Sequence, residues 1–154
     1  MLPRMYTVVS GSATGPTEVS AFDAALADAG VADLNLVPVS SILPPDAIRL
    51  PEPPEMTPGT TVHAVLAKAV DEEKVAAAVA VAHLEEGYGV ISERTGPDAD
   101  TAEELALEDV EAMAETRNSD IVEVEIESTE AEPDDDPWAS AVALVLLLPG
   151  GTER

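Results

Sequence analysis

An almost unbroken apolar run over residues 138–148, WASAVALVLLL, constrains the fold more than any other part of the sequence. The run carries no charged residue and is too short to span a membrane as a helix. A short continuous run of this kind is typical of a strand that is buried on both faces. We therefore expect residues 138–148 to form a central strand of a covered sheet.

The apolar patterns elsewhere predict an α+β domain in which helices lie over a sheet or sandwich. The segment 75–84 fits both element types, because its alanines favour a helix whereas its valines alternate as in a strand. Pro38 lies within a predicted strand and argues for an edge or a bulge there. Strands are expected over residues 5–9, 34–43, 60–70, 75–84, 88–93, 121–126 and 138–148, and helices over 17–29 and 101–117.

The segments between these elements also carry signals. Small residues over 10–16 predict a loop, and six prolines within 44–58 predict an extended, semi-rigid connector. Thr101 followed by Glu104 fits a capping box at the start of the second helix. Asp23 is expected on the apolar side of the first helix, where a carboxylate is unusual.

The charge of the chain limits its partners. Thirty-one Asp or Glu residues stand against seven Lys or Arg, which gives a formal net charge of −24. No basic face can be built, so we expect neither nucleic acid nor an anionic membrane surface as a partner. Because 45% of the residues are hydrophobic, the chain still has enough apolar material for a core.

Abundant carboxylates with only two lysines suggest a protein that works in concentrated salt, which screens the repulsion between surface charges. The alternative is an ordinary acidic protein. The chain has no cysteine, so disulfides and thiolate chemistry are excluded. Since no run reaches the length of a membrane span and the N-terminus lacks a signal-peptide pattern, the expected location is the cytoplasm.

Few residues offer metal chemistry. His63 and His83 are isolated, and neither has a histidine or cysteine partner at ligand spacing, so structural roles are favoured. The acidic run 132–136 lacks the glycine and the spacing of a calcium loop, which favours a solvated turn. We expect no metal site.

The pair Ser40-Ser41 follows an apolar strand and precedes the segment 42–45, ILPP. Two adjacent serines alone are a weak motif. Two hydroxyls at a buried strand end need hydrogen-bond partners, so one interpretation is a satisfied strand terminus. The other is a serine that attacks its own backbone.

Three segments together resemble the pyruvoyl-dependent arginine decarboxylases. They are GSATGPTEVSAFDAALADAG at 11–30, LNLVPVSSILPP at 34–45 and YGVISERTG at 88–96. The combination of a helix, an Asn-containing strand, Ser-Ser-Ile-x-Pro-Pro and a later Gly-x-Ile-x-Glu is specific, although each piece alone is not. With this resemblance we expect an αββα-type sandwich of mainly antiparallel strands, as a single domain over 1–154.

The resemblance implies a proenzyme that cleaves itself. The Ser41 hydroxyl would attack the carbonyl of Ser40, and β-elimination followed by hydrolysis would convert residue 41 into a pyruvoyl group with loss of ammonia. The products would be a β chain, 1–40, and an α chain, 41–154. The pyruvoyl cofactor would form a Schiff base with L-arginine and support its decarboxylation to agmatine, the entry to polyamine synthesis.

Three further residues match the family's active site. Glu93 corresponds to the proton donor, which needs a raised pKa, and Ile91 on the same strand face would help to form an apolar pocket around it. Asp23 corresponds to the residue that faces the substrate guanidinium. Asn35 corresponds to an asparagine near the cleavage point, where it would polarise a carbonyl or hold an oxyanion. Without the resemblance, each would be an ordinary exposed or strand-end side chain.

The separation of Asn35 from Ser41 bears on the assembly. Six extended residues span roughly 20 Å, so both residues of one chain reach the same substrate only if the strand folds back. The resemblance implies a trimer with active sites shared between subunits. Two alternatives stay open: a pyruvoyl decarboxylase of another amino acid, and a non-catalytic acidic trimer in which Ser40-Ser41 is not cleaved.

Overall fold

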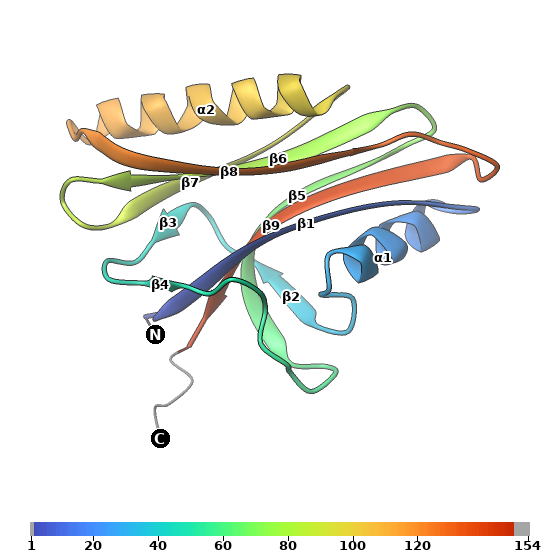
Figure 1. The fold of residues 1–154 in the computed structure, drawn as a ribbon, viewed down its shortest axis with the longest axis horizontal. Helices are drawn as coiled ribbons and strands as arrows, with labels where there is room; N and C mark the ends of the chain where they lie inside the picture. Colours follow the sequence, from blue (N-terminus) through green and yellow to red (C-terminus); the bar gives the residue numbers. More distant parts are fainter. Residues whose placement is uncertain (1, 150–154) are drawn as a thin grey trace.

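The computed structural model describes residues 2–149 as two stacked β-sheets with one helix on each outer face (Figure 1). This is the α+β sandwich of mainly antiparallel strands that the sequence predicts. Residue 1 and residues 150–154 of the expected domain lie outside the described part. The elements in chain order are β1 (Met5–Gly15), α1 (Glu18–Asp28), β2 (Asn35–Pro38), β3 (Ile42–Leu43), β4 (Ile48–Arg49), β5 (Thr61–Asp71), β6 (Val75–Leu84), β7 (Gly89–Gly96), α2 (Ala99–Thr116), β8 (Ile121–Ala131) and β9 (Trp138–Leu148).

The first sheet has the strand order β2-β5-β9-β1-β4, with β9 at its centre. This confirms the prediction from the apolar run, since β9 pairs antiparallel with β1 on one side and β5 on the other. Alternate side chains of β9 face α1 and the second sheet, and nearly all of them are fully buried. A strand covered on both faces requires apolar residues at every position.

The second sheet has the order β3-β7-β6-β8 and resolves the ambiguity over 75–84 in favour of a strand. Valines of β6 such as Val79 and Val81 face the first sheet, whereas the alanines between them face α2. The alternation of large and small residues therefore decided the element type, and alanine lets the helix approach the sheet closely.

The two helices begin differently. The prediction of a helix over 17–29 is confirmed by α1, whose N-terminal cap is Thr17. The proposed capping box at Thr101 and Glu104 is wrong, because α2 begins two residues earlier than expected, at Ala99, and Asp98 is its cap. The Asp98 carboxylate accepts a 2.7 Å hydrogen bond from the Thr101 backbone N–H.

The expected loop over 10–16 is also wrong, because β1 continues as a strand to Gly15. Its small residues have another cause. A Cβ atom at Gly11 would lie 2.2 Å from the carbonyl oxygen of Ala25 in α1, and one at Gly15 would lie 2.6 Å from the Ala21 nitrogen. Gly11 and Gly15 therefore allow the helix to pack directly on the strand.

Within residues 2–149, neither helix is long and apolar enough to cross a membrane.

Candidate active site

The chain leaves one sheet and joins the other at Ser40-Ser41. Upstream, β2 pairs in parallel with β5, and the Val39 N–H donates to the Ala64 carbonyl oxygen at 3.0 Å. Downstream, the Ser41 carbonyl oxygen accepts a 2.7 Å hydrogen bond from the Ile91 N–H, and β3 then pairs antiparallel with β7. The single strand predicted over 34–43 is therefore wrong, since it consists of two short strands in different sheets.

Pro38 accounts for part of this break, because proline has no N–H to donate to a ladder and is found at strand edges or ends. β2 ends at Pro38, and the peptide between Ser40 and Ser41 lies between the last bond to β5 and the first bond to β7. Ser40 is exposed, which corrects the expectation of a buried strand end, and Ser41 is half-buried. The scissile peptide of the predicted cleavage is thus accessible and belongs to neither sheet.

Glu93 lies along the same edge, on β7 (Gly89–Gly96). The pairing of β3 with β7 places Ser41 beside Ile91, so Glu93 follows two positions further on and shares the strand face of Ile91. Ile91 itself is fully buried between the sheets. The register therefore brings Ser41 and Glu93 to one face of one sheet edge.

Glu93 is exposed to solvent, but surrounding protein atoms remove part of the hydration of its carboxyl group. This partial burial raises the pKa of Glu93, and the negative charge of Asp109 on α2 raises it further. Both effects favour the protonated form. The direction is the one that a proton donor near neutral pH requires.

Asp23 and Asn35 lie away from this edge in the single chain. Asp23 is exposed, so the expectation that it lies on the apolar side of its helix is wrong; α1 buries only a narrow stripe that includes Ala21 and Ala25. Asp23 lines an open hollow of about 1000 Å³ between α1 and the proline-rich connector. The same hollow is lined by three further carboxylates, Asp33, Glu52 and Glu55.

Asn35 begins β2 and is exposed. Its side-chain Nδ2 donates to the Gly59 carbonyl oxygen at 3.1 Å, and its backbone N–H donates to the Thr60 carbonyl oxygen at 2.9 Å. Asn35 is thus bonded to the neighbouring backbone. The rest of β2 and the crossing separate it from Ser41. Asn35 and Asp23 belong to the α1-covered side of the molecule, whereas Ser41 and Glu93 belong to the second sheet.

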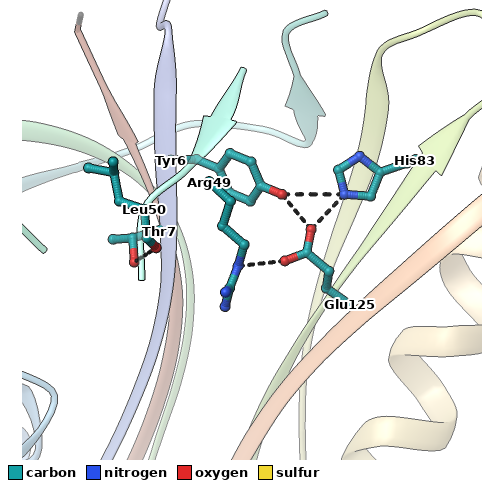
Figure 2. Close-up of polar contacts among 6 residues, drawn as sticks. All are labelled: Tyr6, Thr7, Arg49, Leu50, His83 and Glu125. Carbon is teal, nitrogen blue, oxygen red and sulfur yellow. Dashed lines mark hydrogen bonds and ion pairs between the residues drawn. The ribbon is translucent and has the colours of Figure 1, made fainter. Parts of the chain in front are cut away.

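A polar cluster that the sequence did not indicate joins the two sheets (Figure 2). Tyr6 of β1 donates through its hydroxyl to Glu125 Oε2 of β8 at 2.5 Å, and His83 Nε2 of β6 lies 2.6 Å from the same oxygen. Arg49 Nε of β4 lies 2.6 Å from Glu125 Oε1, as an ion pair without hydrogen-bond alignment. We call these four residues the inter-sheet cluster.

The inter-sheet cluster gives His83 carboxylate and phenol partners. Burial and the bond to Glu125 hold the pKa of Tyr6 well above its usual range, so its hydroxyl stays a donor. Among residues 2–149, no three His, Asp or Glu side chains are arranged to hold a metal ion. The only sequence signal for the cluster was the alternation of Glu123 and Glu125 with apolar residues. This alternation predicts which face of the strand carries the glutamates but not which residues they contact.

Comparisons with known proteins all point to one family. The family model described as pyruvoyl-dependent arginine decarboxylase (PvlArgDC) matches residues 5–150. Curated proteins with that name are similar to the chain over most of its length. One from Methanopyrus kandleri is 47% identical over 147 residues, which cover 95% of this chain and 97% of the relative.

Two others are more distant. A pyruvoyl-dependent arginine decarboxylase from Methanothermobacter thermautotrophicus is 39% identical and covers 79% of this chain and 83% of its own length. One from Pyrococcus abyssi is 32% identical over 96% of both chains. Because the family model spans nearly the whole chain and these relatives cover most of it at 32–47% identity, the chain belongs to the pyruvoyl-dependent arginine decarboxylase family.

Proposed function

We propose that this protein is a self-processing carboxy-lyase that converts L-arginine to agmatine and CO₂ with a pyruvoyl group made from Ser41. Family membership supports the activity and the cofactor. The observation that supports the residue assignment is the crossing at Ser40-Ser41, which leaves a peptide between two sheets and bonds Ser41 to Ile91, two positions before Glu93 on β7.

The residues at the crossing fit the formation of such a group. Ser41 Oγ attacks the carbonyl carbon of Ser40, the C–N bond breaks, and an ester forms. Loss of the Cα proton of residue 41 then breaks its Cβ–O bond, which leaves a carboxylate on Ser40 and a dehydroalanine. Water hydrolyses the dehydroalanine to a ketone and ammonia. Serine is required because the step needs a β-oxygen that first attacks and then leaves.

The crossing would also let the two cleavage products stay together, because the residues on each side of the cut keep their hydrogen bonds to a sheet. Val39 is held by β5, and the Ser41 carbonyl oxygen and β3 are held by β7. The β chain 1–40 and the α chain 41–154 would therefore stay assembled. Their terminal residues 1 and 150–154 lie outside the described part of the structure.

The pyruvoyl group, at residue 41, supplies a ketone that withdraws electrons as CO₂ is lost. The chain's own residues provide the rest of the chemistry. Glu93 holds a proton at neutral pH, as its raised pKa allows, and delivers it to the substrate α-carbon. Asp23 binds the guanidinium through two parallel hydrogen bonds. Asn35 orients a carbonyl near the cleavage point.

We further propose that the active unit is a trimer whose sites are shared between subunits. Asp23 and Asn35 are exposed on the side of the first sheet, whereas Ser41 and Glu93 lie on an edge of the second sheet. A neighbouring copy that supplies the missing half would bring both pairs to one substrate.

Adaptation to concentrated salt is proposed on the net charge of −24. A cytoplasmic location and a role in polyamine synthesis stay predictions.

Intact mass after purification tests the proposal most directly. We expect two fragments that correspond to 1–40 and 41–154, with the larger one blocked to Edman sequencing. The Ser41→Ala variant should remain one chain, while Ser119→Ala, a serine in the turn after α2, should cleave normally. A wild-type chain that stays whole after long incubation in concentrated salt would support the non-catalytic alternative.

Agmatine release from L-arginine tests the substrate. We expect turnover of L-arginine and little turnover of L-ornithine, L-lysine or L-histidine at equal concentration. Cleaved protein that prefers another of these amino acids would retain the pyruvoyl chemistry and overturn the assignment of arginine.

A further inference from the structure

Asp109 of α2 binds both residues that flank Glu93. Ser92 Oγ donates to Asp109 Oδ2 at 2.6 Å. Arg94 donates to the same carboxylate twice, from Nε to Oδ2 at 2.6 Å and from Nη2 to Oδ1 at 3.0 Å. Because side chains alternate along a strand, Ser92 and Arg94 lie on the α2 side of β7 and Glu93 on the opposite side. One carboxylate thus fixes the strand immediately before and after Glu93.

This contact occurs where β7 has lost its outer neighbour. β3 pairs with β7 only at Gly89 and Val90, and the Ser41 carbonyl oxygen adds one further bond at Ile91. Beyond Ile91, β7 is bonded to β6 on one side alone. A free edge has no ladder to fix its backbone, so the side-chain bonds to Asp109 take over that role.

We propose that Asp109 is a positioning residue for Glu93, which it holds in place for proton delivery through Ser92 and Arg94. The proposal rests on the proposed function, in which Glu93 is the proton donor. A bidentate bond between arginine and a carboxylate fixes direction as well as distance, so it can set the orientation of the strand segment.

The charges around Glu93 give this arrangement a second effect. From α2 comes Asp109, and from β7 itself comes Arg94, whereas Glu108 of α2 acts on Arg94 and not on Glu93. β6 presents the uncharged Val79 opposite Glu93, and the inter-sheet residues of β5 packed near β7 (Val65, Ala67 and Ala69) are also uncharged. The bond from Arg94 holds the pKa of Asp109 low, so Asp109 stays ionised and favours the protonated form of Glu93.

Two variants that break the same bond separate this effect from a merely structural one. Asp109→Asn removes the negative charge and leaves Arg94 unpaired, so the pKa of Glu93 should fall. Arg94→Gln removes the positive charge and keeps Asp109, so the pKa should stay or rise. Both should lower the maximal kcat by roughly tenfold, because both loosen the strand around Glu93.

The readout is the pH dependence of kcat for agmatine formation, measured on fully cleaved protein at one salt concentration. Protonated Glu93 is the active form, so turnover declines as pH rises through its pKa. We expect this decline at lower pH in Asp109→Asn and at equal or higher pH in Arg94→Gln. Glu108→Gln, which removes the neighbouring carboxylate but no bond to Ser92 or Arg94, should match the wild type.

A decline that shifts in the same direction in both variants, or in neither, would overturn the proposal. Should Asp109→Asn fail to fold, a decline at lower pH in Arg94→Gln would overturn it as well. The proposed function is tested separately by Glu93→Gln. If that variant turns over normally, Glu93 is not the proton donor, whatever the Asp109 variants show.

Discussion

The candidate residues fall into two groups that differ in their surroundings. Asp23 and Asn35 belong to the part of the molecule that α1 covers, and both side chains are exposed. Ser41 and Glu93 belong to the sheet that α2 covers, where the Ser41 carbonyl is bonded to Ile91 and the strand of Glu93 is tied to the helix. Asp23 thus lines an open hollow, whereas the backbone on either side of Glu93 is fixed by hydrogen bonds to α2.

This difference corresponds to two tasks in the proposed reaction. A residue that moves a proton needs a fixed position and a shifted pKa, and both depend on neighbours in its own chain. A residue that recognises a charged substrate group needs access, and the walls of its pocket can come from another subunit. We therefore expect Ser41 and Glu93 to control chemistry and Asp23 to control substrate binding. Three variants examine that division.

The largest effect is expected for Glu93→Gln. Cleavage at Ser40-Ser41 should proceed, while kcat should fall by roughly 10²–10⁴-fold, the usual contribution of a general acid. The measurement combines intact mass with agmatine release under saturating arginine. Loss of cleavage in this variant would mean that Glu93 also takes part in self-cleavage, which would contradict its assignment to substrate turnover alone.

A smaller effect, and of another kind, is expected for Asp23→Asn. Removal of a charged hydrogen-bond acceptor should raise KM for arginine by roughly 10–100-fold, with cleavage and kcat nearly unchanged. Glu18→Gln, in the first turn of the same helix but outside the hollow, is the matched control. If kcat falls and KM stays constant, Asp23 does not act in recognition.

The smallest effect on activity is expected at the inter-sheet cluster, which belongs to neither group. Tyr6→Phe removes the hydroxyl that donates to Glu125 and should lower the free energy of unfolding by about 1.5 kcal/mol, with cleavage and kinetics unchanged. Denaturant unfolding at fixed salt measures this difference.

The same variant has a pH signature. Because the pKa of Tyr6 is raised in the folded protein, its contribution is fully present below the pKa of an exposed tyrosine. That contribution is lost as pH rises above that value. Wild-type stability should therefore decline more steeply than that of Tyr6→Phe in alkaline solution. Equal pH dependence in the two proteins would contradict the role given to the hydroxyl.

Sequence periodicity was sufficient for most elements of the fold. The apolar run 138–148 indicated a central strand, and α1 and α2 followed from helical spacing, because burial imposes a regular pattern. Local sequence pattern gave the wrong element where a tertiary contact determined the residue type. Gly11 and Gly15 resembled a loop because a sequence does not show that a helix will pack on them.

The candidate site was predicted only through its likeness to a family. Ser41 and Glu93 are far apart in the sequence, and only the change of sheet after Pro38 brings them to one edge. Asp109 and the inter-sheet cluster gave no usable signal, since each of these residues is an ordinary polar or charged one whose partner lies on another element. Contacts of this kind follow from topology and not from local pattern.

The strand β1 lies between β9 and β4 in the first sheet, although it precedes the proposed cut and both of its neighbours follow it. A cut chain would thus be a complex of two polypeptides in which the larger one is hydrogen-bonded to both sides of β1. Melting it would release two polypeptides in place of one, so the transition would become sensitive to dilution. Self-processing would thereby turn a unimolecular folding equilibrium into a bimolecular one.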